Sequence, residues 1–146
     1  MEKGGGLLLS DHRAQGDDHE IVSSHPFPEI GVRSSPAPEP KRDTPELVID
    51  GTHPITGGLA GKARFTPAAI EHKGHRHIAY ERRTFEPGPK GPVLVRNAFG
   101  DPVLVAGQVG KGRVVLVGFF YGRDMPVEGV KRQVYEGALR WLAGMG

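Results

Sequence analysis

The chain has 146 residues, of which 37% are hydrophobic and 25% charged, which is typical of one globular domain with one core. Its net charge of +2 comes from interspersed signs without a basic patch, and no apolar run approaches the roughly 20 residues of a membrane helix. The apolar run at Leu7–Leu9 is too short for a signal peptide. We therefore expect a single domain over 1–146, cytoplasmic by default, that binds neither nucleic acid nor a membrane.

The first predicted element is a short buried strand over Leu7–Ser10. Three glycines precede this apolar run, and the polar pair Asp11-His12 follows it. A parallel strand needs cover on both faces and paired neighbours, yet only six residues come before this one. We expect either an edge strand or a domain that is incomplete at its N-terminus.

A proline-rich loop is predicted over 24–45, because proline neither donates to a strand ladder nor fits inside a helix. A brief strand over Glu46–Asp50 follows it. The next passage, His53–Leu59, is rich in turn residues. We expect His53 to anchor this turn through a hydrogen bond to the backbone.

Further strands are predicted over Arg76–Arg83 and Val93–Asn97. Two valine- and leucine-rich runs, Pro102–Val109 and Arg113–Phe120, flank the short passage Gly110-Lys111-Gly112. Glycine supplies the positive φ angles that tight turns require, so this pattern predicts a β-hairpin.

The last predicted element is an amphipathic helix that begins near Asp124-Met125-Pro126 and ends at Gly144. Its apolar face has spacings of three and four residues and comprises Val127, Val130, Val134, Ala138, Trp141 and Leu142. The face assigned to solvent comprises Glu128, Lys131, Arg132, Glu136 and Arg140. We expect the helix to cover a mixed sheet that contains the hairpin.

Three stretches in this order carry a family resemblance: the glycine-led strand Gly4–Leu9, the passage His53–Leu59, and Gly110–Gly118 with the closing helix. Together they resemble the class I glutamine-amidotransferase-like superfamily, in particular its trehalose-utilisation-like members. The resemblance implies an α/β fold, flavodoxin-like, with a mixed sheet, a C-terminal hairpin and a closing helix. Members normally carry strand–helix units before the glycine-led strand, so the resemblance implies that this chain is part of a larger domain.

In glutaminase members of that superfamily, a sharp turn after the glycine-led strand carries a catalytic cysteine. The corresponding turn here begins Ser10-Asp11-His12, and the chain contains no cysteine. Thioester chemistry on glutamine is therefore excluded. The resemblance implies a noncatalytic or accessory domain that needs no cofactor and binds a carbohydrate-related small molecule or a protein partner.

Asp11 and His12 are nevertheless candidate catalytic residues, because open α/β sheets bind ligands at the carboxyl ends of their strands. With His19 they form a candidate site for a divalent metal ion. The alternative function is thus a hydrolase-like enzyme that uses Asp11 and His12, with or without assistance from a divalent metal ion. The competing interpretation of these residues is a solvated polar loop.

A second group of imidazoles comprises His72, His75 and His77, and strand alternation would place the last two on one face. Lys73 and Arg76 are interposed, and nearby cations oppose a bound metal ion. The sequence therefore favours an exposed transition from loop to strand here. Exposed apolar sheet edges also make a homo-oligomer possible.

Overall fold

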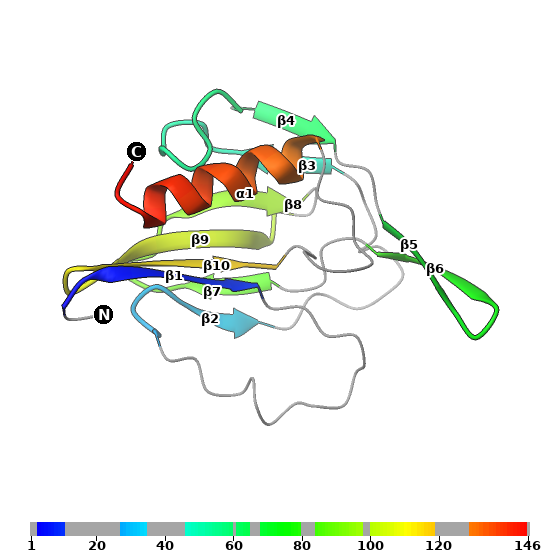
Figure 1. Cartoon of the computed structure of the whole chain (residues 1–146), viewed down its shortest axis with the longest axis horizontal. Coiled ribbons are helices and arrows are strands. Elements are labelled where there is room, and N and C mark those ends of the chain that lie inside the picture. The colour runs from blue at the N-terminus through cyan, green and yellow to red at the C-terminus, as the bar shows by residue number, and fades with distance from the viewer. Residues whose placement is uncertain are drawn as a thin grey trace.

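The computed structural model describes residues 3–10, 27–34, 46–59, 61–64, 68–79, 84–97, 100–118 and 129–145 (Figure 1). The elements in these ranges are β1 (Gly5–Ser10), β2 (Gly31–Ser34), β3 (Glu46–Ile49), β4 (Gly61–Arg64), β5 (Ala68–His72), β6 (His75–Ala79), β7 (Thr84–Pro87), β8 (Val93–Asn97), β9 (Pro102–Val109), β10 (Gly112–Val117) and α1 (Gly129–Leu142). No helix in this part of the chain is long and apolar enough to cross a membrane.

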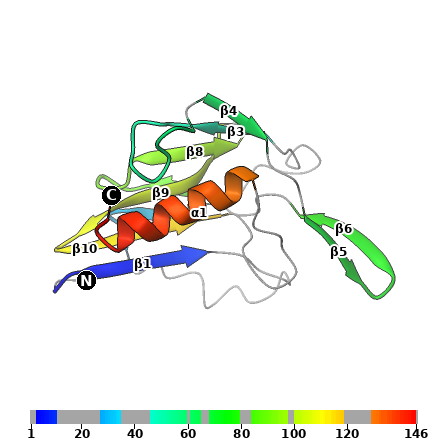
Figure 2. The same ribbon diagram turned by 45° about the horizontal axis from the view of Figure 1, so that its top comes forward.

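Six strands form one mixed sheet in the order β1-β10-β9-β8-β3-β4. β1 pairs with β10 in parallel, and the other neighbours are antiparallel. α1 lies across one face of this sheet, while the two-stranded ribbon β2–β7 lies on the other (Figures 1 and 2). The prediction of a mixed α/β fold covered by the final helix is confirmed.

The larger core lies between α1 and the sheet. It contains Leu47, Ile49, Ile55, Leu94, Val95, Val103, Leu104, Ala106, Val115, Val117, Val134, Ala138 and Trp141. The smaller core lies under the β2–β7 ribbon and contains Ile30, Phe85, Val105, Val114 and Leu116. Successive residues of β10 enter the two cores in turn, so both faces of this strand are buried, which explains its unbroken apolar sequence.

The predicted hairpin is confirmed as β9 and β10, whose first pair across the turn is Val109 with Gly112. The turn itself consists of Gly110 and Lys111, and Gly110 has a φ of 59°. Glycine tolerates this left-handed conformation without the steric penalty of a Cβ. The predicted strand Val93–Asn97 is also confirmed, as β8.

The end of α1 is held by a Schellman motif, as the glycine at position 144 indicated. The backbone N–H of Met145 donates to the carbonyl of Arg140 at 2.8 Å, and that of Gly144 donates to the carbonyl of Trp141 at 3.0 Å. Arg113 of β10 also donates from Nη1 to the carbonyl of Trp141. This cation at the carboxyl end of the helix fastens α1 to the sheet.

β1 is an edge strand, one of the two possibilities that its sequence left open. Leu8 packs against the larger core and Leu9 against the smaller one, although both remain half-buried. The edge of β1 that faces away from β10 has no paired strand among the described elements.

The strand predicted over Arg76–Arg83 is confirmed for Arg76–Ala79 as part of β6, which begins at His75 and pairs with β5; residues 80–83 lie outside the described residues. Two sequence predictions need correction. The proline-rich loop 24–45 contains a strand, β2, because Gly31–Ser34 lies between its prolines and pairs with β7. Lys131, assigned above to the solvent face, is 1% exposed.

Candidate functional site

Three strands of the main sheet end at the same edge. β1 and β10 run in parallel with Ser10 beside Val117, and β8 shares their direction because both β8 and β10 are antiparallel to β9. The ends of these strands, at Ser10, Val117 and Asn97, define what we call the carboxyl edge. In Figure 1 the arrowheads of β1 and β8 point toward it. Open α/β sheets place their ligands at such an edge.

The turn between β8 and β9 places a fixed amide and carboxylate at this edge. Asn97 is 2% exposed, and its Oδ1 accepts a hydrogen bond of 3.0 Å from the backbone N–H of Asp101. Its Nδ2 donates to Oδ2 of Asp101 at 3.1 Å. The backbone N–H of Asn97 also donates to the carbonyl of Asp101 at 3.0 Å. Because the bonds are reciprocal, the two polar groups hold one orientation.

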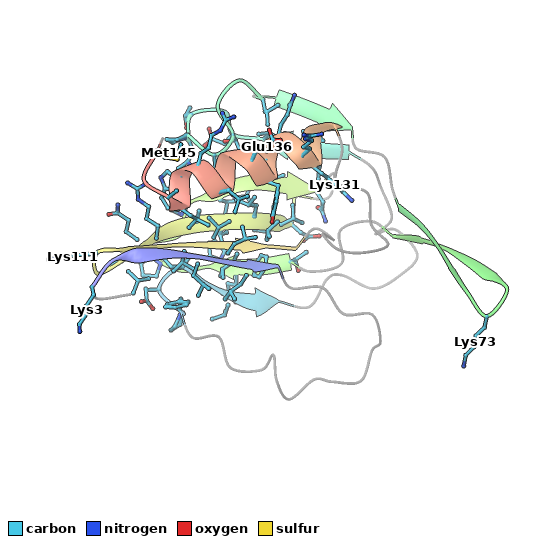
Figure 3. All side chains as sticks on the ribbon, viewed as in Figure 1. Lys3, Lys73, Lys111, Lys131, Glu136 and Met145 are labelled. Atoms are coloured by element: carbon cyan, nitrogen blue, oxygen red, sulfur yellow. The ribbon has the colours of Figure 1, made fainter. Side chains whose placement is uncertain are left out.

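A buried cation lies near the same edge. Gly6, near the start of β1, lies against Leu142, so α1 runs antiparallel to β1 and its first turn lies toward the carboxyl edge (Figures 1 and 2). Lys131 occupies that turn and begins the buried stripe that continues with Val134 and Ala138 (Figure 3). The spacing of three residues between Lys131 and Val134 is typical of one buried helix face, whereas the charge of Lys131 predicted a position in solvent.

The residues predicted from sequence for catalysis and metal binding, Asp11, His12 and His19, lie outside the described residues. The last described residue before them is Ser10, at the carboxyl edge. Among the side chains that the structure describes, which do not include those of His72, His75 and His77, no three His, Cys, Asp or Glu lie close enough to hold a metal ion. Asn97, Asp101 and Lys131 were not identified from the sequence as site residues.

A second polar region lies where α1 meets the Pro54–Leu59 turn. A hollow of about 420 Å³ is lined by the Pro54–Leu59 turn and by Gln133, Glu136, Arg140 and Met145. Figure 3 labels Glu136 and Met145. Glu136 accepts a hydrogen bond from Nε of Arg132 at 2.9 Å, and this contact raises the pKa of the Arg132 guanidinium. The side chain of Arg132 is 67% exposed and that of Glu136 46% exposed, so water screens their attraction.

His53 has a structural role in the turn beside this hollow. Its Nδ1 accepts a hydrogen bond of 3.2 Å from the backbone N–H of Ile55, as predicted from the sequence. Its ring meets Trp141 edge to face, with centroids 5.1 Å apart. Burial lowers the pKa of the imidazole, although the nearby carboxylate of Asp50 partly opposes this shift. The neutral ring is therefore favoured, and its Nδ1 already accepts the hydrogen bond from the backbone N–H of Ile55.

Neither a known protein family nor a curated protein matches the sequence. Solved structures with a similar fold include the cytoplasmic protein STM3548 from Salmonella typhimurium, which is 13% identical with a TM-score of 0.58; the match covers 97% of this chain and 56% of that one. The cytoplasmic protein STM1381 from Salmonella typhimurium LT2 is 18% identical with a TM-score of 0.55, and the match covers 99% and 55% of the two chains.

The chain thus spans just over half the length of these two proteins. At such low identities the likeness extends to the fold alone. Fold and sheet topology together define the chain as an α/β protein with a mixed sheet, whose carboxyl edge carries a buried lysine and a fixed Asn–Asp pair.

Proposed function

We propose that this chain is an amidotransferase-like domain without glutaminase chemistry that binds a carbohydrate-related ligand at the carboxyl edge. The flavodoxin-like arrangement and membership in a larger domain are parts of this proposal. Both are supported by the parallel pairing of β1 with β10 and by the length of the two similar structures. The absence of cysteine removes the nucleophile that glutaminase chemistry requires.

The observation that carries the proposal is that strand ends and polar groups lie together at the carboxyl edge. Strand ends from β1, β8 and β10 meet there beside the first turn of α1. Lys131 brings a positive charge to this region, and Asn97 with Asp101 brings hydrogen-bonding groups in a fixed geometry. A hydroxyl-rich ligand with an anionic group, such as a sugar phosphate, matches this combination of groups.

Isothermal titration calorimetry against neutral sugars, sugar phosphates and nucleoside monophosphates tests the proposal. We expect a sugar phosphate to bind, and Lys131→Met to weaken this binding at least tenfold, because methionine keeps an apolar stem but lacks the charge. Lys111→Met is the matched control, since Lys111 is exposed in the β9–β10 turn at the opposite end of the sheet. Absence of binding across the panel, in protein with a normal circular dichroism spectrum, would refute the ligand proposal.

One observation favours the hydrolase-like alternative. β1 ends at Ser10 on the carboxyl edge, and Asp11 and His12 directly follow it in the chain. A carboxylate and an imidazole are suited to acid–base chemistry, with or without a divalent metal ion also bound by His19.

Hydrolysis of phosphate esters and of glycosides should then be abolished by Asp11→Asn and by His12→Ala. Metal analysis of protein purified without a histidine tag would detect an ion lost in the His19→Ala variant. Hydrolysis that is unchanged in the Asp11 and His12 variants would eliminate this alternative.

A further inference from the structure

The β5–β6 hairpin brings three histidine positions together. β5 and β6 are antiparallel, with His72 opposite His75 and Ile70 opposite His77. The two-residue turn between them consists of Lys73 and Gly74, with φ angles of 52° and 76°. Two successive positive φ angles are typical of the type I′ turn, which matches the twist of paired strands and fixes their register.

This register assigns all three histidines to one face. Directly opposed residues of an antiparallel pair share a face, and so do residues two apart along a strand. His72 therefore shares a face with His75, and His75 shares it with His77. Opposed positions have Cβ atoms about 4.5–5.5 Å apart, and positions i and i+2 are separated by about 6.6 Å along the strand. These are spacings at which several imidazoles can reach one metal ion.

The register also removes the objection that cations are interposed. Arg76 is opposite Glu71, so both belong to the other face of the hairpin. Lys73 is exposed in the turn, at the tip of the hairpin (Figure 3). In sequence the two cations alternate with the histidines, but on the paired strands neither cation occupies a position between histidines on the shared face.

The hairpin extends away from the main sheet in both views (Figures 1 and 2), and it makes no extensive contact with another described element. Imidazole is the commonest protein ligand for transition metals, and three imidazoles with one open position form a known zinc set.

We propose that His72, His75 and His77 form a Zn²⁺ site on one face of the β5–β6 hairpin. Three imidazoles and a water molecule are a known tetrahedral ligand set for this ion. This site is separate in sequence from Asp11, His12 and His19 and does not depend on the function proposed above. Zinc at this position would tie the two strands together near their turn.

The test uses the full chain purified without a histidine tag, stripped of metal, and titrated with ZnCl₂ against a chromophoric chelator. We expect one Zn²⁺ per chain, and at least a tenfold loss of affinity in each of His72→Gln, His75→Gln and His77→Gln. Co²⁺ substituted for Zn²⁺ should give the visible absorption of a tetrahedral centre, and this absorption should be lost in the same variants.

Two controls separate this site from others. Arg76→Gln changes the opposite face of the same hairpin and should leave zinc affinity unchanged. The variant carrying Asp11→Asn, His12→Ala and His19→Ala should also still bind one zinc ion. Absence of zinc binding by the wild type, or zinc binding that persists when all three hairpin histidines are replaced, would overturn the proposal. Circular dichroism of each variant verifies that binding is compared between folded proteins.

Discussion

The His53–Leu59 turn and the β5–β6 hairpin both carry histidine in a polar, turn-rich sequence, yet their relations to the core are opposite. In the first, Ile55 and Thr56 are buried, and His53 meets Trp141 of α1. The second stands apart from the sheet, with its exposed turn at Lys73 and Gly74. The histidine of the first turn therefore serves packing, whereas those of the hairpin belong to the zinc site that we propose.

The strongest test of this difference is the loss of Trp141. The indole is 7% exposed, meets His53 edge to face, and has the guanidinium of Arg113 5.1 Å from its centroid. Trp141→Ala should destabilise the protein by about 3–5 kcal/mol, because it leaves a cavity and removes these ring contacts. Equilibrium unfolding in urea measures the change, and Trp141→Phe, which keeps a ring, should cost less. A loss below about 1 kcal/mol for Trp141→Ala would contradict a structural role for this contact.

A smaller effect is expected from Gly137→Ala. A Cβ at position 137 would lie 2.1 Å from the carbonyl oxygen of Ile55, so the turn and α1 can approach only because this residue is glycine. We expect a loss of about 1–3 kcal/mol from this overpacking, although alanine favours the helix by about 1 kcal/mol. Gln133→Ala, at an exposed helix position, is the control and should not destabilise the protein. Equal or higher stability for Gly137→Ala would mean that the turn moves aside without cost.

The pH dependence of stability should report the burial of His53. Burial lowers the pKa of His53 in the folded protein, so its contribution is fully present above the unfolded pKa of about 6.5 and is lost as the pH falls below that value. Protonation at Nδ1 also removes the acceptor for the backbone N–H of Ile55. His53→Asn keeps a side-chain acceptor but does not titrate, so its stability should fall less steeply than that of wild type between pH 7 and pH 5.

Urea midpoints at several pH values measure this difference. The range stops at pH 5 because the pKa of Asp50 is lowered from 3.8 by hydrogen bonds from Thr52, so that carboxylate loses its contribution only at lower pH. Equal slopes for wild type and His53→Asn would show that the pKa of His53 is the same in the folded and unfolded protein, which would contradict the lowering by burial.

Much of the fold could be predicted because the relevant signals are local. The valine-rich runs around Gly110 identified β9 and β10, and Gly144 marked the end of α1. The elements that were missed depend on pairing between distant residues. β2 lies among prolines and pairs with β7, more than fifty residues later. β5 has little apolar alternation, so its strand character comes mainly from the turn at Lys73-Gly74.

The candidate site was less predictable, because residue type and position gave conflicting indications. The charge of Lys131 assigned it to solvent, whereas its spacing from Val134 places it in the buried stripe of α1. The role of Asn97 depends on its reciprocal bonds with Asp101, which follow from the geometry of the β8–β9 turn. For the histidines of the β5–β6 hairpin, sequence order suggested that Arg76 would repel a bound metal ion. The strand register places Arg76 on the opposite face of the hairpin.

The smallest expected effect on stability concerns the histidines of the β5–β6 hairpin. In metal-free buffer, replacing His72, His75 and His77 together with alanine should change the free energy of unfolding by no more than about 0.5 kcal/mol, because the hairpin makes no extensive contact with another described element. Urea unfolding in the presence of a chelator measures this change, with Trp141→Ala as the positive control. A loss of 2 kcal/mol or so would indicate that the histidines pack against the rest of the protein. Unchanged stability together with lost zinc binding would assign these positions to the metal alone.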